Sequence, residues 1–256
     1  MKIAPALRSI VESALAGRVS APFTYPDHKV VETVPSGIPE IDSLAGGLPR
    51  GSLTEICGPP CSGRTSLLFS ALASRTSQLE ACALIDVRDA FDPHAAEAAG
   101  VDLKNLLWVR CRDVEQSLRA ADLLLQGGGF GLIALDLSEI PPQTVRYVPL
   151  NAWFRFRKTV EDTPTIFLLL EQESNAKTCA SLVLGVGMDS SHWTSISESF
   201  GDTHACLLDG FHVRAEILRS KIESVAKISP DQRHRHFSPR SETIFKVATN
   251  WSSQKN

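Results

Sequence analysis

The chain has 256 residues, of which 43% are apolar and 21% charged, and its formal net charge is −3. These values are ordinary for a soluble globular protein and leave room for one large α/β domain with extensions. No apolar run approaches the ~20 residues needed to cross a bilayer, which excludes a spanning helix, and we expect a cytoplasmic protein without membrane contact. None of the six cysteines forms a C-x-x-C pair, so a zinc or disulfide framework is disfavoured.

The N-terminus predicts an amphipathic helix over residues 1–20. Its apolar residues share one helical face, and a linker with two prolines, Pro22 and Pro26, separates it from the rest of the chain. Such a helix is expected to dock on its own domain or on a neighbouring subunit.

The segment GPPCSGRT, residues 58–65, predicts a phosphate-binding loop. A β-prone run at 53–57 precedes it and a helical pattern at 65–74 follows, which is the order that a P-loop requires. Its backbone N–H groups and the helix N-terminus would bind a nucleotide's phosphates, although a chance Gly-Pro-Ser turn has the same composition. The candidate nucleotide-binding residues here are Gly58, Pro59, Pro60, Cys61, Ser62, Gly63, Arg64, Thr65 and Ser66.

Arg64 stands where the P-loop pattern has lysine. A guanidinium keeps the positive charge but is planar, longer and suited to contacting two oxygens at once. Phosphate binding is therefore expected to survive this change, whereas catalytic competence is in question.

Apolar strands then alternate with helices. Strands are expected at 81–86, 106–109, 131–136 and 164–170, and helices at 93–99, 113–125 and 149–160. This alternation predicts an α/β fold with a mainly parallel central sheet flanked by helices, and such sheets bind ligands at the carboxyl ends of their strands. Asp136 ends one strand there, so Thr65 and Asp136 are candidate Mg²⁺ ligands if a nucleotide binds; the alternative for Asp136 is a turn cap.

The helix at 149–160 mixes aromatic and basic residues, a combination that can bind single-stranded nucleic acid. Trp153 and Phe156, however, share a helical face with Val160, while Arg155 and Lys158 point elsewhere. Core packing beneath a solvated basic face is the preferred interpretation.

The C-terminal third predicts a long loop, a strand and a basic tail. Residues 171–201 are polar and rich in Gly and Ser, which favours a functional or mobile loop. Strand-like alternation returns at 205–223, where Arg219 and Lys221 would point the same way. Residues 210–256 carry nine Lys and Arg against four Asp and Glu. We expect residues 224–256 to form a basic, partly disordered tail that contacts nucleic acid or an acidic partner, or is merely solvated.

Five segments in chain order resemble the RecA family. They are VVETVPSGIPEIDSLAGGLPRGSLTEICGPPCSGRTSLLF, CALIDVRDAFDPHAAEAAGVDLKNLLWV, GLIALDLSEI, FLLLEQES and AEILRSKIES, within a predicted core domain at 30–223. The resemblance implies a RecA-like P-loop core with ATP and Mg²⁺ as ligands. It places Gln172 at the family's γ-phosphate sensor, where the alternative is an ordinary polar strand end. It also places Arg219 and Lys221 at basic positions that reach an adjacent subunit's nucleotide or DNA, where the alternative is an exposed strand face.

The sequence departs from RecA at catalytic positions. Arg64 replaces the P-loop lysine, and Arg88 stands where RecA has the glutamate that orients the attacking water. The family's first DNA-binding loop looks trimmed. Glu139 is a weak candidate for a substitute base, and no other catalytic residue is assigned.

With these departures, the chain resembles the ImuA family of RecA-like accessory proteins. That resemblance implies a DNA-repair accessory role in damage-induced translesion synthesis (the SOS response), with a weak or vestigial ATP site. The implied partners are RecA, a Y-family polymerase homologue, single-stranded DNA and further copies of the chain. The alternatives are an active, filament-forming DNA-dependent ATPase and recombinase, and a RecA-fold module that binds no nucleotide.

Overall fold

The computed structural model describes residues 31–195, 206–221 and 242–248. The chain divides into two units, Met1–Val31 and Glu32–Asn256, and the account below concerns the second. The predicted N-terminal helix, His234 and His236 and most of the predicted tail lie outside the described residues.

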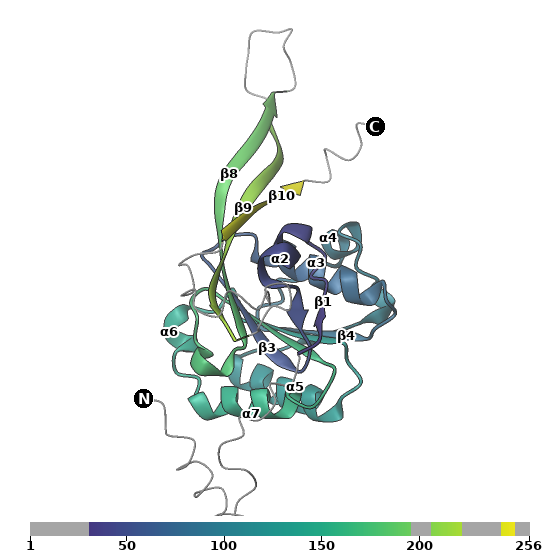
Figure 1. Ribbon diagram of the computed structural model, residues 1–256, viewed down its shortest axis with the longest axis vertical. Helices are drawn as coiled ribbons and strands as arrows, with labels where there is room; N and C mark the ends of the chain where they lie inside the picture. Colours follow the sequence, from purple (N-terminus) through teal and green to yellow (C-terminus); the bar gives the residue numbers. More distant parts are fainter. Residues whose placement is uncertain (1–30, 196–205, 222–241, 249–256) are drawn as a thin grey trace, which may run out of the picture. The chain divides into compact units, whose positions relative to one another are not determined.

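An eight-stranded sheet forms the centre of this unit (Figure 1). Its strand order is β10-β9-β8-β3-β7-β6-β4-β5. The six strands from β8 to β5 run parallel, and β9 is antiparallel to both of its neighbours, β8 and β10. The α/β fold with a mainly parallel sheet is therefore confirmed. The strands are β3 (Ser52–Cys57), β4 (Cys82–Asp86), β5 (Leu106–Arg110), β6 (Leu132–Asp136), β7 (Ile166–Glu171), β8 (Leu182–Ser195), β9 (Cys206–Ser220) and β10 (Glu242–Ala248).

Helices cover both faces of the sheet (Figure 1). One face carries α2 (Pro39–Ala45), α3 (Arg64–Thr76) and α4 (Pro93–Ala98), and the other carries α5 (Val114–Gly127), α6 (Pro142–Val145) and α7 (Leu150–Val160). The central strands are buried on both sides, because in β7 Phe167 faces one apolar cluster and Leu168 the other. A small sheet of β1 (Thr33–Val34) and β2 (Leu48–Pro49) precedes β3, and the 3₁₀ turn η1 (Leu103–Asn105) precedes β5.

Two of the three aromatic residues of α7, Trp153 and Phe156, belong to the core, while Phe154 is exposed. Trp153 and Phe156 are 1% and 0% exposed, and Phe156 packs against Phe167 with ring centroids 5.4 Å apart. The prediction of core packing for this helix is confirmed.

The prediction of a long loop at residues 171–201 was wrong. After a short 3₁₀ turn, η2 (Lys177–Cys179), the chain enters β8, which pairs with β9 in a long antiparallel hairpin. Only the first part of β8 lies beside β3; the rest pairs with β9 beyond the end of β3, where polar side chains such as Asp189 and Ser190 are tolerated. Because of these polar residues, the sequence of this part of β8 lacks the apolar alternation that predicts a strand.

The predicted tail also contains a strand. Residues 242–248 form β10, which pairs with β9 through seven residue pairs and buries Phe245. The core therefore extends beyond the predicted limit at residue 223. Among the described residues, the structure has no helix with the length and apolar character that a membrane span requires.

Candidate nucleotide-binding site

The segment between β3 and α3 has the backbone conformation of an anion-binding loop. Cys61 and Gly63 have φ values of 60° and 90°, in the left-handed region, and Gly63 is the N-cap residue of α3. The helix's first main-chain hydrogen bond runs from Leu67 N to Gly63 O, 3.1 Å. The N–H groups at the start of α3 therefore have no acceptor within the helix, and they form a site for negative charge.

The β8–β9 hairpin lies tightly against this loop. A Cβ on Gly58 would lie 2.1 Å from the carbonyl oxygen of Val186, and one on Gly63 would lie 2.5 Å from Cγ2 of Val213. Neither position has space for a side chain, so the glycines allow the hairpin backbone to approach the loop.

Arg64 is buried with one nitrogen that has no partner. The residue is 5% exposed, and its Nη1 has no hydrogen-bond acceptor among the described residues. Burial lowers the pKa of the guanidinium, while the nearby Asp136 and Glu139 favour its charged form. An arginine nevertheless stays charged in proteins, so an anion is the natural acceptor for this nitrogen. The hydroxyl of Ser62, in a residue that is 1% exposed, also has no partner in the described chain.

Asp136 and Gln172 are connected through Ser138. Oδ1 of Asp136 accepts from the N–H of Ser138 at 2.9 Å and from its hydroxyl, and Nε2 of Gln172 donates to Ser138 O at 2.9 Å. Burial raises the pKa of Asp136, an effect that the Ser138 hydrogen bonds and Arg64 oppose. The end of β6 is thus linked to the end of β7 beside the phosphate loop.

A cavity of about 490 Å³ opens over the loop. The loop contributes its residues from Cys61 to Ser66, and the segment after β6 contributes Ser138 and Glu139. The opposite wall comes from the hairpin and consists of Met188, Ser191, Trp193, Leu208 and Phe211. The sequence predicts Arg64, Thr65 and Glu139 at this site, but it does not predict the hairpin wall, because the polar residues 171–201 indicate a loop.

The oxygen atoms around the cavity suit a magnesium ion. Thr65 and Glu139 line it, and Asp136 adjoins Arg64 closely enough to affect its pKa. Hydroxyl and carboxylate oxygens are ligands that Mg²⁺ prefers. Within the described ranges, no group of three or more His, Cys, Asp or Glu is arranged to hold a metal ion without help from a ligand.

Arg88, which follows the end of β4, has no carboxylate that could orient a water molecule. The residue is exposed, and its N–H donates to Oδ1 of Asp86 at 3.1 Å. Oδ2 of Asp86 accepts from the N–H of Phe91 at 3.0 Å and from Trp108 Nε1 at 3.3 Å. The carboxylate of Asp86 thus stabilises the turn that follows β4.

Arg219 and Lys221 lie away from the phosphate loop. Arg219 pairs in register with Val183, and Lys221 follows the last residue of β9, so the predicted alternation along one strand face ends before it. Lys221 N donates to Ser181 O at 2.8 Å, and its Nζ donates to Thr178 O. Since Ser181 N in turn donates to Leu53 O, Lys221 is level with the start of β3, whereas the loop follows its end. Lys221 is therefore positioned to reach another molecule rather than its own loop, whereas Arg219 is level with Glu55 in the middle of β3.

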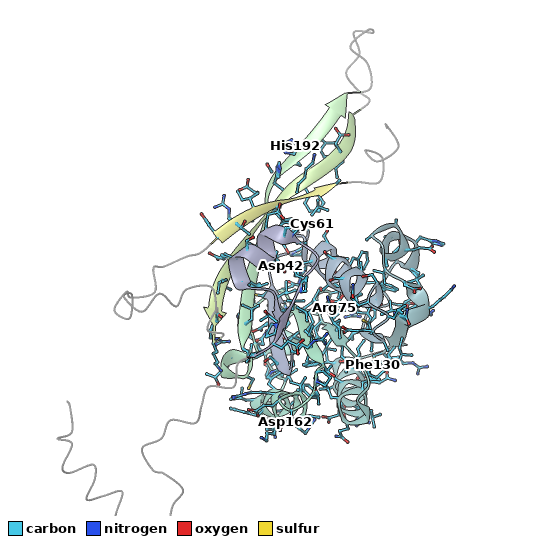
Figure 2. The ribbon with its side chains drawn as sticks, turned by 45° about the vertical axis from the view of Figure 1, so that its right-hand side comes forward. Asp42, Cys61, Arg75, Phe130, Asp162 and His192 are labelled. Carbon is cyan, nitrogen blue, oxygen red and sulfur yellow. The ribbon has the colours of Figure 1, made fainter. Side chains whose placement is uncertain are left out.

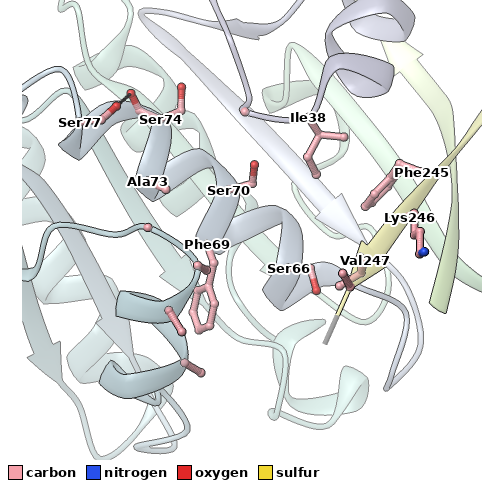
Figure 3. A pocket seen from close by; sticks show the side chains of 16 residues that line it. Ile38, Ser66, Phe69, Ser70, Ala73, Ser74, Ser77, Phe245, Lys246 and Val247 are labelled. Atoms are coloured by element: carbon pink, nitrogen blue, oxygen red, sulfur yellow. Dashed lines mark hydrogen bonds between the residues drawn. The ribbon is translucent and has the colours of Figure 1, made fainter. Parts of the chain in front are cut away.

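A second cavity, of about 810 Å³, lies between α3, α4 and β10 (Figure 3). It meets the first only through Ser66, and its walls are mostly small side chains such as Ser70, Ala73 and Ala98. Its two phenylalanines, Phe69 and Phe245, are 9% and 2% exposed. The cavity has volume but offers almost no aromatic surface.

Comparison with known proteins identifies the family. The family described as the RecA N-terminal domain matches residues 4–143, more than half of the chain. The chain belongs to the RecA N-terminal domain family. Protein RecA of Acholeplasma laidlawii is 40% identical over 112 residues, which cover 43% of this chain and 34% of the relative. Protein RecA of Acinetobacter baumannii (strain AYE) is 39% identical over 110 residues, which cover 42% and 32%.

The matched stretch spans about a third of the length of these RecA relatives. Membership therefore accounts for the phosphate loop and for the strands from β3 to β6, which lie within the matched residues. It does not by itself transfer the activity of a whole RecA protein to this chain.

Proposed function

We propose that this RecA-family chain is a DNA-repair accessory protein that binds ATP and Mg²⁺ between β3 and α3 but hydrolyses ATP poorly. The observation that carries the proposal is the buried Arg64 guanidinium, whose Nη1 has no acceptor in the described chain. A buried, unsatisfied charged donor is costly, and a phosphate oxygen would satisfy it.

Poor hydrolysis follows from two positions. Arg64 stands in place of the P-loop lysine, so the compact ammonium group is absent. Arg88 stands where RecA has its water-orienting glutamate, and it supplies no carboxylate. Transition-state groups of this kind are often worth ~3 kcal/mol or more each, so losing both would slow turnover by several orders of magnitude. Mg²⁺ would be held by Thr65 and, through water, by Asp136, and it would neutralise phosphate charge.

The proposed biological role is recruitment rather than catalysis. In damage-induced translesion synthesis in the bacterial cytoplasm, RecA-like surfaces would bring RecA or a Y-family polymerase homologue to single-stranded DNA. Lys221, level with the start of β3, and Arg219, two residues before it in the chain, would contact a second protein or the DNA backbone.

Cys61 provides a direct test of nucleotide binding. It is the exposed cysteine of the described chain, since Cys57, Cys82, Cys111 and Cys179 are buried. In a Cys206→Ser background, ATP with Mg²⁺ should slow the reaction of Cys61 with a maleimide. Unchanged labelling, together with no heat of binding in calorimetry, would reject the nucleotide site.

A steady-state ATPase assay with and without single-stranded DNA tests the second half of the proposal. Turnover should stay near background in both conditions. A second candidate function, an active DNA-dependent ATPase, is favoured by one observation, namely that Glu139 lines the same cavity as Arg64. Brisk turnover that is lost in both Glu139→Gln and Arg64→Ala would establish that alternative.

A further inference from the structure

Cys61 is an exposed thiol within the anion-binding loop. It lines the cavity of about 490 Å³ together with Ser62 and Arg64, and its backbone φ of 60° belongs to the turn that leads into α3. We propose that Cys61 is a modification site, at which a mixed disulfide forms with a small thiol that carries carboxylates, of the class of glutathione. The inference goes beyond the proposed function, because it requires an anion site at the loop but does not require ATP binding.

Reactive thiol chemistry in the described part of the chain is confined to this residue. Cys57, Cys82, Cys111 and Cys179 are buried, and burial raises the pKa of each thiol, to about 12 for Cys57 and Cys82. The thiolate is the form that attacks a disulfide, so a buried thiol with a raised pKa is inert. The thiol of Cys57 also donates to Leu184 O at 3.6 Å. Cys61 is therefore the described cysteine that can react with a dissolved disulfide.

The atoms around Cys61 select for negative charge. Ser62 Oγ and Arg64 Nη1 have no hydrogen-bond partner among the described residues, although these residues are only 1% and 5% exposed. The N–H groups at the start of α3 likewise have no acceptor within the helix. Burial lowers the pKa of Arg64, and the charges of its neighbours, Cys61 among them, act in the opposite direction, so the two side chains lie within electrostatic reach of each other. A carboxylate attached to Cys61 would supply the acceptor that these donors lack.

The reaction is a thiol–disulfide exchange in which glutathione disulfide is the oxidant. The Cys61 thiol releases its proton to water, and the thiolate attacks one sulfur of the disulfide. A new S–S bond forms to Cys61 while the original S–S bond breaks, and one glutathione leaves as a thiolate that takes up a proton. Cys61 is oxidised and the departing glutathione is reduced, and an excess of reduced glutathione reverses the step.

The attached group would close the loop to other anions. A volume of about 490 Å³ is within the range of small-molecule sites, so the cavity has room for a tripeptide. The carboxylates of the glutathionyl group would occupy the donors that a phosphate would otherwise use. The modified chain would therefore bind phosphate ligands only after a thiol has removed the group.

The two ends of α3 provide a matched control. Figure 2 labels Cys61 at the base of the β8–β9 hairpin and Arg75, in the last turn of α3, away from the hairpin. Ser77 is the exposed C-cap residue of this helix and lines the second cavity. A thiol introduced by Ser77→Cys in a Cys61→Ser background would lie at the carbonyl end of the same helix, where an anion is disfavoured.

The experiment measures the equilibrium constant of mixed-disulfide formation by intact mass spectrometry, on the full chain in a Cys206→Ser background. Glutathione disulfide, which carries carboxylates, is compared with hydroxyethyl disulfide, which is neutral. The preference of Cys61 for glutathione should exceed that of the Ser77→Cys thiol by roughly tenfold, a factor that one charge-assisted hydrogen bond can supply. Arg64→Met should remove most of this preference, and Arg64→Lys, which keeps the charge, should retain most of it.

Inorganic pyrophosphate gives a second measurement that needs no change in the loop. It should slow the reaction of Cys61 with glutathione disulfide and leave the reaction of the Ser77→Cys thiol unchanged. Equal preferences at the two positions, or a lack of protection by pyrophosphate, would overturn the inference. A glutathione preference in a chain that shows no heat of binding with MgATP would support the inference and reject the proposed nucleotide site. MgATP binding without a glutathione preference would reject the inference alone.

Discussion

Val213 of β9 occupies the space where Gly63 of the phosphate loop would carry a side chain. A Cβ there would lie 2.5 Å from Cγ2 of the valine, and Gly63 has a φ of 90° that other residues rarely adopt. The hairpin and the loop are therefore one packed unit, and changes at either residue should affect the other.

Gly63→Ala should lower the free energy of unfolding by about 1–3 kcal/mol, because it combines backbone strain with a clash. Val213→Ala removes the clashing methyl groups, so the double variant should lose less than the two single variants together. Urea unfolding of all four proteins measures the coupling. Strict additivity would mean that the valine does not press on the loop.

Glu171 should make the stability fall as pH rises. Burial, with Glu55 nearby, raises the pKa of Glu171 well above its usual value. The folded chain thus keeps a proton that the unfolded chain releases above about pH 4.3, so unfolding becomes easier by up to about 1.4 kcal/mol per pH unit until the folded-state pKa is passed.

Glu171→Gln cannot ionise and keeps an oxygen for Asn175 Nδ2, which donates to Oε2 of the glutamate at 2.6 Å. Relative to wild type, this variant should become progressively more stable from pH 5 upward in urea titrations. Glu173→Gln, at a carboxyl that is 51% exposed, should show no such trend. A constant difference between the wild type and Glu171→Gln at all pH values would contradict a buried, protonated Glu171.

The strands that end at the site could be predicted from the sequence. Runs such as residues 131–136 are continuously apolar because the strand is buried on both faces of the sheet. Asp136 ends this run at the carboxyl end of the strand, where the candidate site lies. The loop followed from its glycines, because only a few sequences permit the left-handed turns and the close approach at Gly58 and Gly63.

The cavity's second wall could not be predicted in the same way. Beyond Gly185, which pairs with Cys57, β8 no longer pairs with β3, and the hairpin residues Asp189 to Trp193 lack the apolar alternation of a half-buried strand. That Trp193 faces Arg64 across a cavity depends on the pairing of β8 with β9, which the local sequence does not specify. The sequence likewise does not show that Nη1 of Arg64 is buried without an acceptor, because this depends on how the surrounding elements pack.

Arg64→Met should stabilise the ligand-free protein and remove its response to nucleotide. The guanidinium is buried with an unsatisfied nitrogen, so an apolar side chain of similar length should raise the free energy of unfolding by about 1 kcal/mol. Wild type should gain further stability from MgATP in thermal melts, whereas the variant should not. Arg112→Met, at an exposed arginine, serves as the control. Marked destabilisation of Arg64→Met without ligand would assign Arg64 a structural role instead.

Replacing Glu80 should destabilise the fold, because this carboxylate pairs with two arginines, one of them buried. Its Oε1 accepts from Arg50 Nη2 at 2.6 Å and from Arg75 Nη1 at 3.2 Å, and the Arg75 side chain is only 6% exposed. Glu80→Ala leaves that buried guanidinium without its carboxylate, which should cost about 3 kcal/mol of stability.

Glu115→Ala is the comparison, because Glu115 pairs with Arg119 on the surface of α5 with both side chains more than 70% exposed. Losing that pair should cost no more than about 0.5 kcal/mol. Urea midpoints of the two variants, measured at pH 7 and again in 0.5 M salt, separate the cases, since added salt should erase the small Glu115 effect and leave most of the Glu80 effect. Similar midpoints for the two variants would show that water, rather than Glu80, solvates Arg75.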